Sequence, residues 1–173
     1  MLFRSRGIRR LAFDAALKRL AADPTLSRAD RQTALGSRVE LARLGVPRDT
    51  VQVSLPEPLL KDVRDEVARN DREITDGYER QAVITGDAYL LGLAGLWAES
   101  DALLKANLAK SHSPYYLMSQ LGSNARKQGR KDEALRWYGE AFDKSVGPAT
   151  RLQWGSSYLT ALVRSEEHTS ELQ

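Results

Sequence analysis

The side chains that could carry out chemistry in this chain are few. The sequence contains no cysteine, and His112 is its only histidine between residues 6 and 163. A zinc site needs a set of Cys, His or carboxylate ligands, and a hydrolytic triad needs a histidine with positioned partners. We therefore predict no metal site, no cofactor and no catalytic residues, and we interpret His112 as a polar residue near a helix C-terminus.

Carboxylates are densest in DREITDGYER, residues 71–80, which contains Asp71, Glu73, Asp76 and Glu79. Two such groups could act as a general acid and a general base. Because Arg72 and Arg80 are interleaved with them, we favour a solvated helix end with ion pairs. The glycines of ITGDAYLLGLAG, residues 84–95, do not form a phosphate-binding loop and indicate close helix packing instead.

A basic cluster and four aromatic residues are the remaining candidates. RKQGRK, residues 126–131, could capture an acidic tail or a phosphate, although a solvated turn between two helices explains it better. A peptide-binding surface could include Tyr115, Tyr116, Trp137 and Trp154. Because of their bulk, we favour packing between helices as the role of Trp137 and Trp154.

Composition limits the possible partners. Hydrophobic residues make up 42% of the 173 residues and charged residues 28%, which fits a soluble globular chain. The formal net charge is +3, and acidic residues are interspersed with the basic ones, so the clustered basic face that nucleic-acid binding needs is absent. The most apolar run, residues 88–98, is shorter than the ~20 residues that span a bilayer. We expect neither nucleic acid as a partner nor membrane insertion.

Apolar spacing and helix-boundary residues predict a chain of helices. The expected helices cover residues 8–23, 27–44, 58–74, 78–94, 98–111, 114–129, 131–144 and 148–163. In the first, Leu11, Phe13, Leu17 and Leu20 have helical spacing. Ser27 and Asp30 predict a capping box at the start of the second. Between them and the third helix, the proline-containing VPRDTVQVSLPEP predicts an extended connector, and its alternating Val51, Val53 and Leu55 could instead form an edge strand.

One segment has the pattern of a helical repeat. QGRKDEALRWYGEAFDKS, residues 128–145, resembles the second half of a tetratricopeptide repeat, with Gly129 at the turn and small or aromatic residues at Ala134, Tyr138 and Ala141. Leu121 and Gly122 match the preceding helix. Upstream, the same offsets recur at Ala102, Ala106, Ala109 and Pro114, whereas Leu90 and Gly95 depart from the pattern. We predict an all-α fold of antiparallel helical hairpins, stacked as a TPR-like right-handed α-solenoid without a sheet.

The resemblance to this repeat also implies a binding groove. Its concave positions would be Tyr116, Ser119, Ser123, Arg126, Lys127 and Gln153. Such a polar groove with one basic end suits a protein or an extended peptide as the partner. The stripe Leu152, Leu159 and Leu162 of the last helix would be partly exposed if that helix lacks a neighbour, and we then expect poor solubility.

Both ends of the chain resemble translated sequencing-library adapter. RSEEHTSELQ, residues 164–173, can be encoded so that the complementary strand of its first five codons encodes MLFRS, residues 1–5. We treat both ends as adapter-derived artefacts and exclude them from fold reasoning. The organisation we expect is a helical hairpin at 6–47, a Pro-containing linker at 48–57 and TPR-like repeats at 58–163, together forming a fragment of a longer protein.

Residues 99–163, from ESDALL to LTALV, and DREITDGYERQAVI, residues 71–84, are similar to the C-terminal helical region of bacterial thioredoxin-family proteins. The resemblance implies a preceding thioredoxin fold with a thiol pair for disulfide exchange, often exported, hence a periplasmic location. None of those active residues exists in this chain. We expect a non-catalytic helical appendage to a thiol–disulfide oxidoreductase. The alternatives are a freestanding TPR-like interaction scaffold and a catalytic helical domain that depends on Asp76 or Glu79.

Overall fold

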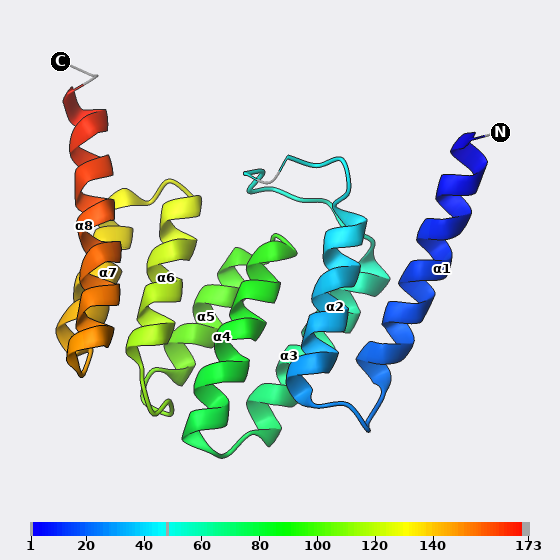
Figure 1. Cartoon of the computed structure of the whole chain (residues 1–173), viewed down its shortest axis with the longest axis horizontal. Helices are drawn as coiled ribbons and strands as arrows, with labels where there is room; N and C mark the ends of the chain where they lie inside the picture. The colour runs from blue at the N-terminus through cyan, green and yellow to red at the C-terminus, as the bar shows by residue number, and fades with distance from the viewer. Residues whose placement is uncertain (1, 48, 171–173) are drawn as a thin grey trace.

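The computed structural model describes residues 2–47 and 49–170, with the side chains of 7–47 and 49–164. Within these ranges the chain is all helical (Figure 1). The helices are α1 (Leu2–Ala22), α2 (Arg28–Ala42), α3 (Glu57–Glu73), α4 (Gly77–Leu93), α5 (Trp97–Asn107), α6 (Tyr115–Lys127), α7 (Lys131–Lys144) and α8 (Pro148–Ser170). The described residues contain no strand, so the predicted all-α class without a sheet is confirmed, and Val51, Val53 and Leu55 lie in a loop.

Parts of three predicted segments lie outside this description. Residue 48, the first of the expected linker, is one of them, and so are residue 1 and residues 171–173 of the adapter-like ends. Where the backbone of those ends is described it is helical, because α1 begins at Leu2 and α8 continues to Ser170.

Local polar contacts explain where α2 and α4 begin. The Ser27 hydroxyl accepts a hydrogen bond from the Asp30 N–H at 3.1 Å and donates one to the Asp30 carboxylate at 2.6 Å, so Ser27 caps α2 as predicted. Asp76 caps α4 by accepting from the N–H groups of Tyr78 and Glu79 at 3.0 and 2.8 Å. These caps satisfy N–H groups that the first helical turn leaves without an intrahelical partner.

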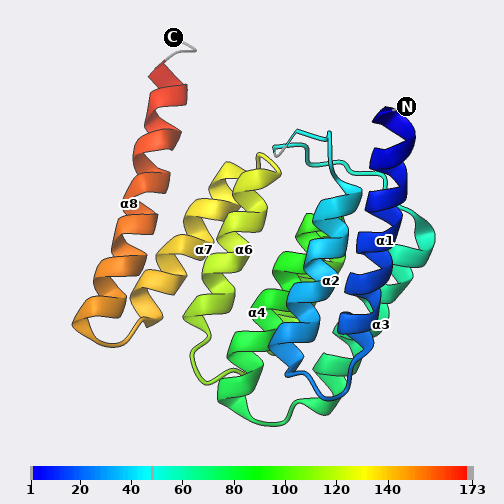
Figure 2. The ribbon, with the colours of Figure 1, turned by 45° about the vertical axis from the view of Figure 1, so that its right-hand side comes forward.

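The helices are arranged as a row with a second layer behind it (Figures 1 and 2). Helix α4 contacts α2 on one side and α6 on the other, and α3 and α5 also pack against α4. Helix α7 packs on α6, while α1 contacts α2 and α8 contacts α7 at the two ends. In Figure 2 the C-terminal half of α8 leads away from α6 and α7.

Two apolar clusters form most of the core. The first joins α2, α3 and α4 through Leu35, Val39, Leu59, Val63, Val67, Leu90 and Leu91. The second joins α4 to α7 through Ile84, Ala88, Leu104, Leu117, Met118, Leu121, Trp137 and Ala141. Because each cluster draws on three or four helices, no single hairpin buries its apolar face alone.

Several structural features recur at a spacing of 34 residues rather than the predicted 32. Gly95 and Gly129 both end a helix with positive φ, +82° and +74°, and they are 34 residues apart. At the same separation, Ser100, Leu104 and Asn107 of α5 correspond to the buried Ala134, Tyr138 and Ala141 of α7, and all three are fully buried. The alanines expected at these places, Ala102, Ala106 and Ala109, are exposed, so the 32-residue register was wrong.

Hydrogen bonding explains why Ser100, rather than Ala102, is the buried small residue of α5. Ser100 is buried because its hydroxyl donates to the Ala88 carbonyl at 2.7 Å, which satisfies a polar group at a helix crossing. Gly122 of α6 lies 34 residues after Ala88 of α4, and it is likewise a small residue at a helix crossing. A Cβ there would lie 2.9 Å from the Tyr138 ring, so α6 and α7 approach closely at this position.

The two end helices carry exposed apolar side chains. In α1 the predicted helix is correct, but among its described apolar side chains only Leu17 is buried, and Leu11, Phe13 and Leu20 are exposed because α1 lies at the end of the row with α2 as its main neighbour. In α8 Trp154 is buried, whereas Leu152 and Leu159 are exposed, as expected for a final helix without a further neighbour.

Candidate functional site

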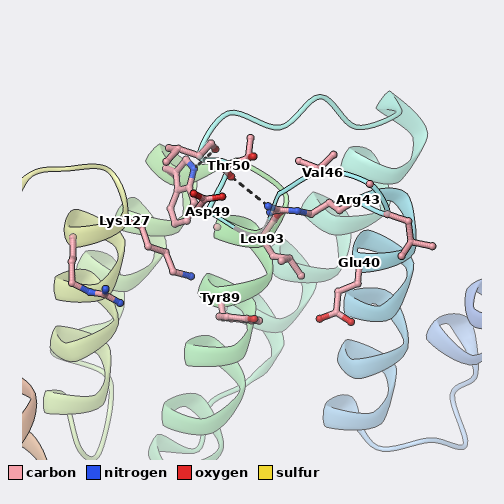
Figure 3. Close-up of a pocket in the computed structure, with 14 residues that line it drawn as sticks. Glu40, Arg43, Val46, Asp49, Thr50, Tyr89, Leu93 and Lys127 are labelled. Atoms are coloured by element: carbon pink, nitrogen blue, oxygen red, sulfur yellow. Dashed lines mark hydrogen bonds between the residues drawn. The ribbon is translucent and has the colours of Figure 1, made fainter.

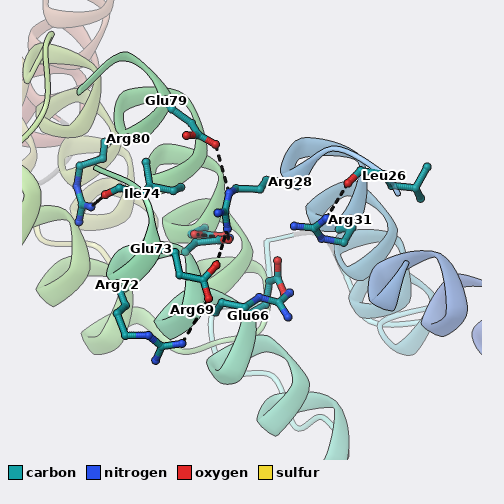
Figure 4. Close-up of polar contacts among 12 residues, drawn as sticks. Leu26, Arg28, Arg31, Glu66, Arg69, Arg72, Glu73, Ile74, Glu79 and Arg80 are labelled. Atoms are coloured by element: carbon teal, nitrogen blue, oxygen red, sulfur yellow. Dashed lines mark hydrogen bonds and ion pairs between the residues drawn. The ribbon is translucent and has the colours of Figure 1, made fainter. Parts of the chain in front are cut away.

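Three of the four carboxylates of residues 71–80 hold helices together, and Figure 4 shows two of them, Glu73 and Glu79. Glu73 and Glu79 both bind the Arg28 guanidinium, at 3.1 and 3.3 Å, which ties α2 to α3 and α4. Asp71 pairs with Arg80 and accepts from the Asn107 amide at 3.0 Å. These ion pairs agree with the favoured interpretation, except that Arg80 is buried rather than solvated.

His112 also has local partners. It lies in the loop between α5 and α6, its ring stacks on Tyr78 at 3.8 Å between centroids, and its Nδ1 is 2.9 Å from the Ser113 hydroxyl. The residues that the structure describes contain no group of three His, Cys, Asp or Glu side chains that could hold a metal ion.

One buried carboxylate lies at the junction of α2, α3 and α4. Asp87 is inaccessible to solvent and accepts hydrogen bonds from the Gln32 amide at 2.6 Å and from the Asn70 amide at 3.2 and 3.1 Å. Gly86 lets Gln32 approach, since a Cβ at Gly86 would lie 2.3 Å from the Gln32 Oε1. Burial raises the pKa of Asp87 to about 7 because neither of its hydrogen-bond donors is a cation.

A cleft with a volume of about 890 Å³ opens between α2, α4, α6 and the loop after α2 (Figure 3). Glu40 lies on α2 and Arg43 directly follows that helix. Tyr89 and Leu93 lie on α4, and Lys127 lies on α6. The cleft therefore crosses three neighbouring helices of the row.

Tyr89 and Trp97 form the aromatic floor of this cleft, and the position of Trp97 depends on Gly92 and on a tethered loop. Gly92 admits the Trp97 ring, because a Cβ at this position would lie 2.8 Å from a Trp97 ring carbon. The Trp97 indole N–H donates to the Val51 carbonyl at 2.8 Å. Arg43 donates to the carbonyls of Leu93 at 2.6 Å and Thr50 at 3.3 Å. The loop is thus held against α4, and it forms the upper rim of the cleft.

Lys127 is the cation that faces this floor. Its ammonium lies 5.6 Å from the ring centroid of Tyr89 and 5.8 Å from that of Trp97, within range of cation–π attraction. Burial of the ammonium, with further repulsion from Arg126 and Arg43, lowers the pKa of Lys127. No described carboxylate pairs with Lys127, so this cation is available to a ligand.

The six predicted groove residues divide between different places. Ser119, Ser123 and Arg126 line a second cleft of about 380 Å³ between α6 and α8, opposite hydroxyl groups of Ser156, Ser157 and Thr160. Arg126 and Lys127 line the larger cleft. Tyr116 packs edge-on against Trp154 at 5.3 Å, and Gln153 is exposed on α8. Arg126 therefore lies on the ridge between the two clefts.

The other predicted features near α6 are also accounted for. Residues 126–131 comprise the end of α6, the turn at 128–130 and the first residue of α7, and Arg130 in the turn binds Asp101 at 2.7 Å and also Glu133. Trp137 and Trp154 are buried between helices, as predicted.

Of the residues that line the larger cleft, only Arg126 and Lys127 were predicted from the sequence, whereas Glu40, Arg43, Tyr89 and Trp97 were among those not predicted. Tyr89 and Trp97 belong to the apolar run at 88–98, whose glycines did indicate close packing. No local pattern, however, shows that this run faces α2 and α6.

Comparison of the chain with protein families, with curated proteins and with solved structures found no match. None of the helices in the described part of the chain is long and apolar enough to cross a membrane.

Proposed function

We propose that this chain is a non-catalytic, TPR-like helical-repeat module that binds an extended segment of a partner protein across α2, α4 and α6. The observation that carries the proposal is the cleft of about 890 Å³ on that face. It crosses three helices, has an aromatic floor and contains an unpaired cation, as an open peptide-binding groove would. Enclosed small-molecule sites instead bury most of their ligand.

The 34-residue register supports the TPR-like part of the proposal. It equals the usual length of that repeat, and it relates the turn glycines Gly95 and Gly129 as well as the small residues Ala88 and Gly122. The contacts of α5 with α6 and of α7 with α8 have the order expected when each hairpin packs on the next.

For the parent protein we propose a thioredoxin-family thiol–disulfide oxidoreductase of the bacterial periplasm, with this module presenting clients to the exchange domain. The second candidate is a freestanding interaction scaffold, which the same cleft would serve equally well. The gene sequence upstream of the codon for residue 6 distinguishes them. An in-frame C-x-x-C after a strand supports the first, and further helical repeats support the second.

Peptide binding can be tested with two tyrosine variants of the same helix. Tyr89→Ala removes the floor of the cleft, whereas Tyr78→Ala removes a more exposed tyrosine of α4 that lies outside it. Tyrosines at the centre of an interface are among the few residues whose truncation costs about 1 kcal/mol or more, so we expect Tyr89→Ala to weaken binding on a peptide array by about tenfold. Tyr78→Ala should bind like the wild type. Equal loss in both variants, or no binding by the wild type, would contradict the proposal.

A further inference from the structure

The two side walls of the larger cleft carry charges of opposite sign. Figure 3 shows Glu40 on α2 and Lys127 on α6 on opposite sides of Tyr89 of α4. Arg126 adds a second positive charge to the α6 wall. Because α4 stands between α2 and α6, Glu40 and Lys127 belong to separate walls rather than to one ion pair.

The remaining charges of the cleft leave this polarity in place. Arg43 and Asp49 both lie at the loop end of the cleft and have opposite signs. Arg43 is further committed to the carbonyls of Leu93 and Thr50. Neither Glu40 nor Lys127 forms a salt bridge with any described side chain. The cleft therefore has an acidic wall and a basic wall, each with a charged side chain that forms no salt bridge within the protein.

An aromatic floor between two such walls favours a particular kind of ligand. Charge-assisted hydrogen bonds are roughly twice as strong as neutral ones, and they strengthen further where apolar groups exclude water. Tyr89 and Trp97 provide that apolar surface beside Lys127. A segment of a single charge would meet repulsion on one of the two walls.

We propose that the cleft recognises an extended peptide segment that carries a carboxylate and a cation on either side of an apolar residue. The carboxylate binds at Lys127 and Arg126, the cation binds at Glu40, and the apolar side chain lies on Tyr89 and Trp97. The inference rests on the proposed function, because it specifies the chemistry of the peptide that the module binds.

The test uses nine-residue peptide mixtures with a central Trp and random neutral residues elsewhere. The mixtures differ only in the residues fixed on the two sides of the Trp. In two mixtures one side is Glu and the other Lys, in either order. In the remaining mixtures both sides are Glu, both are Lys or both are Gln. Affinities are measured by fluorescence anisotropy. The wild type should prefer one Glu/Lys order over the other mixtures by about five- to tenfold, since backbone direction fixes which charge meets which wall.

Charge exchange provides the decisive variant. Glu40→Lys combined with Lys127→Glu keeps the net charge and should invert the preferred order of Glu and Lys in the peptide. The matched control exchanges Lys61 and Asp65, an exposed ion pair on α3, through Lys61→Asp with Asp65→Lys, and it should retain the wild-type order. Circular dichroism verifies that both variants keep the helical fold.

The outcomes separate the two proposals. If the wild type binds the mixtures without regard to charge, or if the charge exchange leaves the preferred order unchanged, the charge assignment is overturned and the peptide-binding function stands. If the wild type binds none of the mixtures, both are overturned.

Discussion

Replacing Asp87 by Asn should remove most of the pH dependence of stability between pH 5 and pH 8. The side chain is fully buried and its hydrogen-bond donors are the neutral amides of Gln32 and Asn70. Its pKa is about 7 in the folded chain, against 3.8 for an unperturbed aspartate. The folded state thus binds a proton that the unfolded state has already released.

The sign and the magnitude follow from this difference. Because the pKa is raised by folding, the stabilisation from the bound proton is complete below about pH 4 and is lost as the pH rises toward 7. Each pH unit in that window changes the free energy of unfolding by about 1.4 kcal/mol. Between pH 5 and pH 8 we expect the wild type to lose about 3 kcal/mol relative to the Asp87→Asn variant.

Urea unfolding followed by circular dichroism at several pH values between 5 and 8 measures this quantity. All other groups are common to both proteins, so their contribution cancels in the difference between variant and wild type. Asp132→Asn, which changes an exposed carboxylate in the first turn of α7, is the control and should parallel the wild type. If the Asp87→Asn and wild-type stabilities run parallel across this range, the assignment of a protonated Asp87 near neutrality is refuted.

Two further variants test the packing. Gly122→Ala places a Cβ 2.9 Å from the Tyr138 ring, and we expect a net loss of about 1–2 kcal/mol in thermal unfolding despite the better helix propensity of alanine. Trp97→Phe removes the hydrogen bond to the Val51 carbonyl, which should cost about 1 kcal/mol and accelerate amide hydrogen exchange in residues 49–56. Unchanged stability in the first, or unchanged exchange in the second, would show that these contacts are not formed as described.

Much of the helix pattern could be predicted because its signals are local. The Ser27 cap, the turn at Gly129 and the helix at residues 131–144 depend on neighbours within a few positions, and all three were correct. The 34-residue spacing was harder to predict than the helix boundaries, because it depends on contacts between helices. Counting alanines selected Ala102, whereas the buried small residue is Ser100, whose burial depends on the Ala88 carbonyl of another helix.

The same limit applies to the candidate site. Arg126 and Lys127 were identified as groove residues from the repeat resemblance, but their partners in the cleft, Glu40 and Tyr89, were not. The walls of the cleft are formed by the packing of α2, α4 and α6 against one another. The apolar periodicity of a helix predicts which of its faces is buried, but not which other helix that face contacts.

Residue types and short-range spacing are sufficient to predict that this chain is helical and where most of its helices begin and end, and the chain contains no cysteine. The 34-residue spacing, the burial of Asp87 and the opposed charges of the cleft depend instead on how the helices pack against one another. Glu40 and Lys127 are 87 positions apart in the chain, and helix stacking alone places them on facing walls.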